Sequence, residues 1–251
     1  MSRVLIRSKD ELGLMRKSGL ISAKALKKTL TAARPSVSLA ELDKIAEEEI
    51  IRLGGQPSFK TVPGYFWTTC LTINDEVVHG TPRDIKLKEG DVLGVDLGAI
   101  YQGWHSDTAW SIEVGGSEKN KFLEVGEKTL WEAITQAREG NRIGDISSAI
   151  QKGVEKAGYD VVKSLAGHGV GRQPHEDPEI PEFGKAGTGL KLKSGMTLAI
   201  EVIYAQGRGT VYEKDDGWTI ATSDGSLGGL FEMSVIVGKK KGEILTDWRT
   251  V

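Results

Sequence analysis

Four acidic residues lie inside apolar, strand-like runs of the sequence, where a carboxylate is an unusual side chain. Their neighbours are mostly Val, Ile, Leu and Phe, which indicates that these runs are buried. Burying an unpaired carboxylate is energetically costly, so each of the four needs a partner. A metal ion shared among them would supply one. The four residues are Asp96, Asp107, Glu201 and Glu232.

Asp96 and Asp107 lie on either side of a short segment, Tyr101–Gly103, that has the composition of a hairpin turn. A hairpin centred on this segment predicts that the two aspartates are cross-strand neighbours on the same face. Two like charges this close repel one another unless one is protonated or a cation lies between them. We therefore predict a metal site on this hairpin.

The chain has only four histidines, and two of them lie in a glycine-rich segment, Gly167–Glu176. Glycines on both sides of His168 permit close approach of the backbone, which favours a ligand role for its imidazole. His105, beside Asp107, is interpreted instead as a hydrogen-bonded structural residue. Four carboxylates and one imidazole form an oxygen-rich set that favours Mn²⁺, Fe²⁺ or Co²⁺ over a thiolate-bound zinc. The glycines lack the lysine and the spacing of a phosphate-binding loop, so nucleotide binding is not expected.

Two helices are predicted before the first of the buried strands. A capping box begins at Ser8, and apolar residues then follow at helical intervals as far as Leu30. A second capping signal at Ser38 starts another helix, which Gly54 and Gly55 would end. β-branched residues and glycine punctuation predict strands at Thr69–Ile73 and within Val92–Val114.

A weak internal repeat relates the two halves of the chain at an offset of about 105 residues. The run Lys86–Gly90 resembles Lys191–Gly195, and the same offset brings Asp96 into register with Glu201. Residues of the predicted helices repeat at a similar offset. We therefore expect one catalytic domain whose two halves supply acids to a shared site. The predicted domain is 1–251, with halves at about 10–115 and 120–240.

Composition limits the classes of function. Apolar residues make up 39% of the 251 positions and the formal net charge is -2, which is ordinary for a globular domain and provides no basic field for specific nucleic-acid binding. The single cysteine, Cys70, cannot form an intrachain disulfide, so a cytoplasmic location is expected. No apolar stretch has the length of a transmembrane helix, and no membrane partner is expected.

The candidate ligands and three short segments closely resemble the type I methionine aminopeptidases of peptidase family M24. The segments are Ile73–Gly80, Gly167–Arg172 and Asp216–Thr219. The resemblance covers nearly the whole chain and implies the α+β pita-bread fold, in which pseudo-two-fold halves form a curved antiparallel sheet covered by helices. The chain resembles a type I enzyme without an N-terminal Cys/His-rich extension, and it lacks the long insertion that type II enzymes carry between the second site histidine, here His175, and the next glutamate, here Glu201.

The resemblance also implies how the five ligands are shared between two divalent metal ions. Asp107 and Glu232 would bridge the ions, and Asp96 would chelate one of them. His168 and Glu201 would complete the other. Cobalt, manganese and iron are the expected ions, with zinc and nickel as further candidates. A water between the ions would attack the first peptide bond, and Glu201 would take its proton as general base.

Five further residues are assigned to the substrate by the same resemblance. His79 and His175 would form hydrogen bonds with the scissile amide and the developing oxyanion. Tyr65, Cys70 and Trp218 match positions that line the methionine pocket of the family, although plain core packing explains Tyr65 and Cys70 about equally well.

The expected function is removal of the initiator methionine from nascent polypeptides in the cytoplasm by a monomer. The resemblance leaves a transient association with the ribosome open. Two alternatives remain. An X-Pro aminopeptidase or prolidase shares the fold and the five ligands, and a catalytically inactive binding protein could use the same scaffold.

Three positions depart from the family pattern. Val202 follows Glu201 where the family commonly has Pro, and Met233 follows Glu232 where His is common. Pro174 occupies a position where bacterial members often place an aromatic residue of the methionine pocket. These departures concern the shape of the pocket and turnover more than metal binding.

Overall fold

The computed structural model describes residues 4–251. Its first two helices, α1 (Lys9–Ala32) and α2 (Leu39–Arg52), begin where the capping signals predict. Ser8 and Ser38 each accept the backbone N–H of a glutamate three residues later, and that glutamate accepts the serine N–H in return. α2 ends just before Gly54, whose φ of 83° is readily adopted only by glycine.

A ten-stranded antiparallel sheet forms the centre of the molecule. Its main path runs β1-β4-β5-β12-β9-β7-β8, and three further strands pair with β4, β9 and β12. The strands of this sheet are β1 (Gln56–Pro57), β2 (Thr69–Ile73), β4 (Val92–Tyr101), β5 (Trp104–Glu113), β6 (Asp160–Val161), β7 (Ala166–Gly169), β8 (Glu176–Pro181), β9 (Thr197–Ala205), β12 (Gly228–Ile236) and β13 (Glu243–Ile244). A separate three-stranded sheet contains β3 (Glu76–Val78), β10 (Val211–Glu213) and β11 (Ile220–Thr222).

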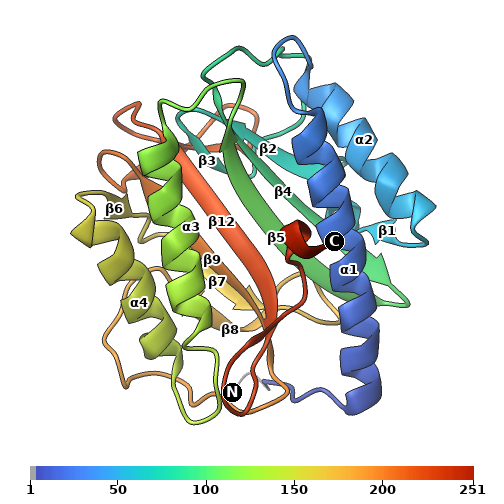
Figure 1. The fold of residues 1–251 in the computed structure, drawn as a ribbon, viewed down its shortest axis with the longest axis vertical. Coiled ribbons are helices and arrows are strands. Elements are labelled where there is room, and N and C mark those ends of the chain that lie inside the picture. The colour runs from blue at the N-terminus through green and yellow to red at the C-terminus, as the bar shows by residue number, and fades with distance from the viewer. Residues whose placement is uncertain (1–3) are drawn as a thin grey trace.

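Four helices cover one face of the large sheet (Figure 1). α1 packs on β4 and β5, while α3 (Asn120–Ile134) packs on β9 and β12, and each has a partner helix, α2 or α4 (Ile143–Lys156). Alternate residues of the strands point into this helix-covered core, including Val95, Leu97, Val202 and Met233. The residues between them therefore point to the opposite face, where the small sheet packs on part of the large one through residues such as Val78 and Leu230.

Equivalent contacts recur in the two halves of the chain. Ser38, before α2, forms an isolated antiparallel bridge with Lys86, and Arg142, before α4, forms the same kind of bridge with Lys191. Both bridges tie the start of a helix to the segment that leads into a long central strand. These matching contacts support our proposal of two related halves within one domain.

The β4-β5 hairpin differs in register from the sequence prediction. Tyr101 still belongs to β4 and pairs with Trp104, so the turn consists only of Gln102 and Gly103, both with positive φ. Asp96 therefore lies opposite Ala109 and not opposite Asp107. The prediction of direct cross-strand neighbours was wrong by two residues. The two aspartates nevertheless share a face, because a shift of two residues preserves the alternation.

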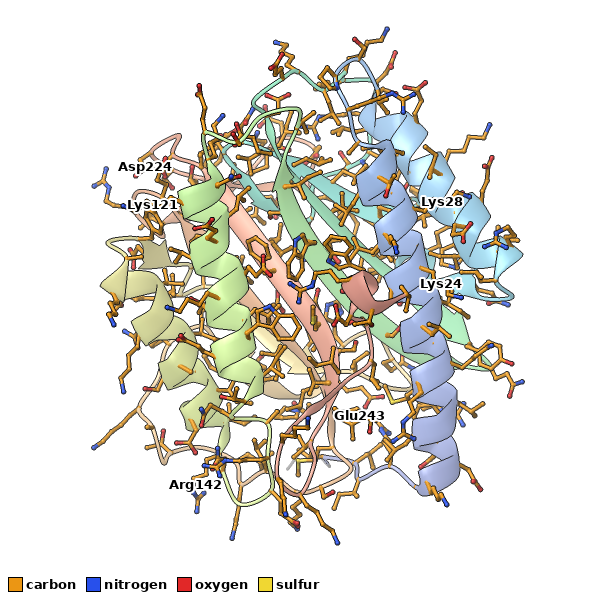
Figure 2. All side chains as sticks on the ribbon, in the orientation of Figure 1. Lys24, Lys28, Lys121, Arg142, Asp224 and Glu243 are labelled. Carbon is orange, nitrogen blue, oxygen red and sulfur yellow. The ribbon has the colours of Figure 1, made fainter. Side chains whose placement is uncertain are left out.

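The chain ends on the helical side of the sheet. A short 3₁₀ helix, η2 (Trp248–Thr250), lies beside α1, and Arg249 places its guanidinium over the rings of Trp110 and Trp131. Lys24 and Lys28 point outward from α1 (Figure 2). Within residues 4–251, no helix combines the length and apolar character needed to cross a membrane.

Candidate metal centre

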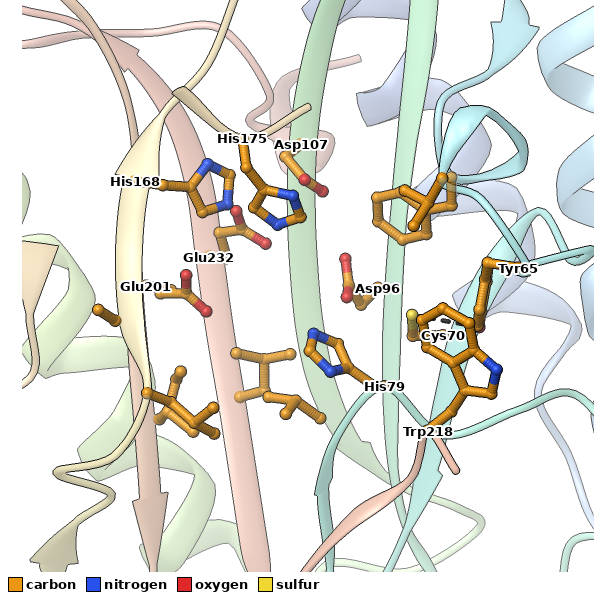
Figure 3. Close-up of a pocket in the computed structure, with 17 residues that line it drawn as sticks. Tyr65, Cys70, His79, Asp96, Asp107, His168, His175, Glu201, Trp218 and Glu232 are labelled. Carbon is orange, nitrogen blue, oxygen red and sulfur yellow. Dashed lines mark hydrogen bonds between the residues drawn. The ribbon is translucent and has the colours of Figure 1, made fainter. Parts of the chain in front are cut away.

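All ten residues predicted for the site line one cavity of about 220 Å³ on the face of the sheet opposite the helices (Figure 3). The acidic residues reach it because each alternates with core residues on its strand. Asp96, for example, lies between Val95 and Leu97, which point toward the helices. The cavity is lined by Tyr65, Cys70, His79, Asp96, Asp107, His168, His175, Glu201, Trp218 and Glu232, together with seven other residues.

The four carboxylates converge where the two halves of the sheet meet. Glu201 and Glu232 are directly opposite each other on β9 and β12, and Glu232 is opposite Ala109 on β5. Ligand atoms of Asp107, His168 and Glu232 all lie within 4.8 Å of one another, which is close enough for one ion to contact all three. Asp96 and Glu201 line the same cavity outside this closest group.

Burial raises the pKa of all four carboxyl groups. The pKa of Asp96 rises to about 7, and the pKa values of Asp107, Glu201 and Glu232 also rise, first through burial and then through the neighbouring carboxylates. One oxygen of Asp96 and one of Glu232 are buried without a hydrogen-bond partner. A divalent cation would satisfy these oxygens and offset the mutual repulsion, so the donor set fits a metal ion.

His168 is oriented as a metal ligand would be. Its Nδ1 lies 2.9 Å from the carbonyl oxygen of Gly169, so Nδ1–H donates there and leaves Nε2 free to coordinate. Burial lowers its pKa to about 3, which keeps the imidazole neutral. Close packing requires glycine on both sides of His168. A Cβ at Gly167 would lie 2.7 Å from the carbonyl oxygen of Ala199, and a Cβ at Gly169 would lie 2.2 Å from that of Asp177.

The other two cavity histidines face the open space beside the acids (Figure 3). The His175 ring centroid is 4.2 Å from that of His168, and His79 has a left-handed backbone with φ of 57°. Both side chains are solvent-accessible, yet burial of the imidazoles lowers their pKa values and favours the neutral form. A neutral imidazole can donate one N–H and accept one proton.

The loop that carries His175 is held by a buried ion pair from the start of the chain. Arg7, whose side chain is 4% exposed, pairs with Glu176. The other Glu176 oxygen accepts the backbone N–H groups of Arg172 and Gln173. This network orders the loop immediately before His175.

An aromatic cluster forms the opposite wall of the cavity. Tyr65 donates a hydrogen bond to the carbonyl oxygen of Thr69 and contacts the Cys70 sulfur at 3.2 Å. Trp218 packs edge-on against Tyr65 with ring centroids 5.0 Å apart. Burial raises the pKa of Cys70, so this group remains a neutral thiol.

Sequence reasoning missed part of the apolar lining. Ile203 and Leu230 line the cavity because each is two residues from a cavity glutamate on the same strand, and alternate residues of a strand share a face. This spacing is visible in the sequence and could have identified both residues. Phe59 and Val62 lie on a 3₁₀ turn, η1 (Phe59–Thr61), and just after it, where no local periodicity indicates which side chains face the cavity.

Two other residues lie outside the set of predicted cavity residues. His105 is hydrogen-bonded to Ser58 at 2.8 Å and does not line the cavity, as expected for a structural residue. Glu182 was not anticipated. It is fully buried, and one of its oxygens accepts the N–H of Ile203, two residues after Glu201. Burial raises the pKa of Glu182, so a neutral carboxyl group is favoured there.

None of the three residues that depart from the expected family pattern lines the cavity. Val202 and Met233 are fully buried on the helix-covered side of the sheet, away from the cavity. Pro174 precedes His175 and is not among the residues that line the cavity.

Metallopeptidase family M24 matches residues 13–237, so the chain belongs to this family of metal-dependent peptidases. Its fold agrees with that assignment. A solved prolidase from Pyrococcus furiosus, 22% identical, superposes with a TM-score of 0.79 and shares the pita-bread fold, although this chain spans only 65% of that protein.

The full-length relatives are methionine aminopeptidases. Those of Clostridium perfringens and Bacillus subtilis are 41% and 39% identical, and the alignments cover 97% of this chain and 98% and 99% of the relatives. The solved methionine aminopeptidase of Thermotoga maritima is 39% identical with a TM-score of 0.94, and 98% of this chain and 99% of that chain are covered. Within family M24, the chain groups with the type I methionine aminopeptidases, which confirms the resemblance and the predicted fold.

Proposed function

We propose that the protein is a metal-dependent aminopeptidase that removes the N-terminal methionine from newly made proteins. The observation that carries this proposal is the single cavity in which a carboxylate and imidazole cluster adjoins an aromatic pocket (Figure 3). Such an arrangement can hold the reacting bond at the cluster and one apolar side chain in the pocket.

Five side chains would hold two divalent ions. The family resemblance implies that Asp107 and Glu232 would be shared by both ions, and these two residues lie with His168 in the tightest group of ligand atoms. Asp96 would bind one ion, and Glu201 with His168 the other. When bound, the ions supply Lewis acidity and lower the pKa of water in the site. The oxygen-rich donor set supports cobalt, manganese or iron.

The pocket suits methionine on chemical grounds. Its wall combines Phe59, Tyr65 and Trp218 with the Cys70 thiol, and Asp96, the cross-strand partner of Cys70, borders it on the side of the acids. A thioether makes favourable contacts with aromatic rings, and an unbranched chain fits between them. The free α-amine of an N-terminus, in its neutral form, is a nitrogen donor that the bound ions could accept, and this would limit cleavage to the first residue.

Three residues would handle the protons of the reaction. Glu201 faces the cavity from β9 and would accept a proton from the attacking water. His79 and His175 would donate hydrogen bonds to the scissile amide and to the developing oxyanion, since both favour the neutral form.

One chain supplies every residue of this cavity, which supports activity as a monomer. The free, buried thiol of Cys70 is compatible with a cytoplasmic location. We propose nascent polypeptides with N-terminal methionine as the substrate, with any ribosome contact being transient.

A peptide panel tests the function. Protein loaded in turn with Co²⁺, Mn²⁺ and Fe²⁺ should release methionine from Met-Ala-Ser much faster than leucine from Leu-Ala-Ser, and should leave Ala-Pro bonds intact. Asp107→Asn should lose activity, whereas Asp224→Asn, the same change on an exposed turn, should retain it. Faster cleavage of Ala-Pro than of Met-Ala would support a prolidase instead. Absence of any cleavage with all three ions would favour a binding protein.

A further inference from the structure

Two walls of the cavity come from segments that the sheet alone does not hold in place. His79 directly follows β3, and Trp218 lies in the turn between β10 and β11. β11 pairs with β3 through Ile220 and Val78, and the register shifts between Ile220 and Ala221. The ladder therefore ends before it reaches either cavity side chain. Beyond it, the Gly80 carbonyl oxygen accepts the N–H of Leu71 on β2 at 2.7 Å, and the Thr81 N–H donates to the Thr219 hydroxyl at 3.4 Å.

One carboxylate joins the two segments beyond the end of the ladder. Asp216 Oδ1 accepts the backbone N–H groups of Trp218 at 3.0 Å and Thr219 at 2.8 Å. Its Oδ2 accepts the hydroxyl groups of Thr219 at 2.6 Å and Thr81 at 2.9 Å. Thr81 is two residues after His79, so Asp216 is hydrogen-bonded to both walls. Hydrogen bonds to a charged acceptor are among the stronger ones in proteins.

Both walls have little freedom to move once this link is made. Gly80, beside His79, is packed so closely that a Cβ would lie 2.2 Å from the carbonyl oxygen of Leu71. Trp218 is packed against Tyr65 in the pocket. Figure 3 shows the His79 imidazole and the Trp218 indole in the cavity that also holds Asp96. A displacement at either end would be transmitted through Asp216 to the other.

We propose that Asp216 is a positioning residue that couples the Trp218 wall of the substrate pocket to the His79 imidazole. Asp216 would then affect both the choice of substrate side chain, through Trp218, and the catalytic hydrogen bond, through His79. Asp216 does not line the cavity and would not touch substrate. This inference rests on the proposed function for its catalytic readout, but the geometry it describes can be measured without substrate.

A second link between the same segments allows the inference to be tested without unfolding the protein. Glu76 is buried and accepts hydrogen bonds from Arg83 at 2.6 Å and Lys214 at 2.9 Å. This ion network joins the base of β3 to the end of β10. Loss of Asp216 should therefore loosen the cavity walls while the small sheet stays folded.

The experiment compares Asp216→Ala, Asp216→Asn and Thr81→Val with a matched control, Asp224→Ala. Asp224 lies on an exposed turn after β11 (Figure 2), where it accepts N–H groups of Arg208 and Ser226, neither of which lines the cavity. It therefore reports the effect of removing a turn-capping aspartate from the same small sheet.

The kinetic outcome should distinguish positioning from general destabilisation. Asp216→Ala should lower kcat/KM on Met-Ala-Ser by about 10- to 100-fold and reduce the preference for Met over Leu, because a shift of the order of 1 Å is enough. Metal content should be unchanged. Thr81→Val should lower kcat and leave the Met/Leu preference intact, because it removes only the bond to the His79 segment. Asp216→Asn should keep much of the preference that Asp216→Ala loses, because its amide oxygen can still accept two N–H bonds. Asp224→Ala should stay within about twofold of wild type.

A spectroscopic readout needs no substrate. In protein labelled with 5-fluorotryptophan, the ¹⁹F resonance that Trp218→Phe removes should shift or broaden in Asp216→Ala and stay in place in Asp224→Ala. An unmoved resonance with an unchanged Met/Leu preference would overturn the inference, as would equal losses in both alanine variants. If wild-type protein releases no methionine, the proposed function fails, and the resonance alone decides whether Asp216 positions this wall.

Discussion

At His168, one backbone contact decides which nitrogen can bind a metal. The hydrogen bond from Nδ1 to the Gly169 carbonyl fixes the tautomer and points Nε2 toward the carboxylates. His79 has no such arrangement. It follows β3 with a left-handed backbone and lines the cavity outside the tightest group of ligand atoms. Two histidines of one cavity are therefore expected to have different functions.

Alanine substitution should separate these two functions. His168→Ala should weaken one metal position and regain part of its activity in excess metal. His79→Ala should bind metal as wild type does but lose about 100- to 10,000-fold in rate, because one hydrogen-bond or proton-transfer partner is gone. Calorimetric titration of metal into both apo variants, with rates on Met-Ala-Ser, checks this. Loss of a metal site in His79→Ala, together with full metal binding by His168→Ala, would reverse the assignment.

At the scale of elements, the two halves of the sheet meet at β5 and β12, where side-chain hydroxyls supplement a short ladder. Only two residue pairs are in register there. The Ser234 hydroxyl accepts the N–H of Asp107 and donates to its carbonyl oxygen, both at 2.8 Å. Ser111 bridges Leu230 in the same manner. The backbone of one candidate ligand is thus held by a serine of the other half.

Ser234→Ala should weaken both the fold and the metal site. The buried N–H of Asp107 would lose its acceptor, which costs about 1–3 kcal/mol of unfolding free energy. Because Asp107 is a proposed bridging ligand, metal affinity should fall as well. Ser111→Ala is the matched control and should lose similar stability with unchanged metal affinity. Chemical denaturation and metal titration measure the two effects, and equal metal affinity in both variants would contradict the expectation.

At the scale of the whole molecule, the cavity concentrates negative charge that the fold must tolerate. The four carboxyl groups have raised pKa values in the absence of metal, and that of Asp96 rises to about 7. A raised pKa means that ionisation opposes folding, so this contribution to stability is present at low pH and is lost as pH rises through the folded-state pKa. Hydrogen bonds from Arg52 lower the pKa of Glu49 to about 2. Groups of this kind change the stability only in more acidic solution, where they become protonated.

The metal-free protein should therefore lose stability between about pH 5 and pH 8, by an amount on the order of 3 kcal/mol. Divalent metal should remove most of this decline, because the ionised carboxylates become its ligands. Thermal unfolding of chelator-treated and Mn²⁺-loaded protein across this range measures both curves. Asp107→Asn, which removes one of the buried charges, should flatten the metal-free curve. Parallel curves with and without metal would show that the carboxylates do not act as ligands.

The sequence by itself determined the helices of the first half and the identity of the acidic strands. The capping boxes at Ser8 and Ser38 are local signals, so their helices begin where predicted. An acid within an apolar strand is also a local anomaly, and all four such acids line one cavity. The roles assigned to the cavity residues came from a family resemblance and remain proposals.

Only the tertiary structure decided the register of the β4-β5 hairpin and the supports of the site. The turn consists of Gln102 and Gly103, so Asp96 pairs with Ala109 and not with the predicted Asp107. Turn geometry sets the register of a hairpin, and composition alone does not. The links from Asp216 to Thr81 and from Ser234 to Asp107 join segments more than a hundred residues apart in the chain. No local pattern encodes such contacts, since they exist only after the two halves have packed together.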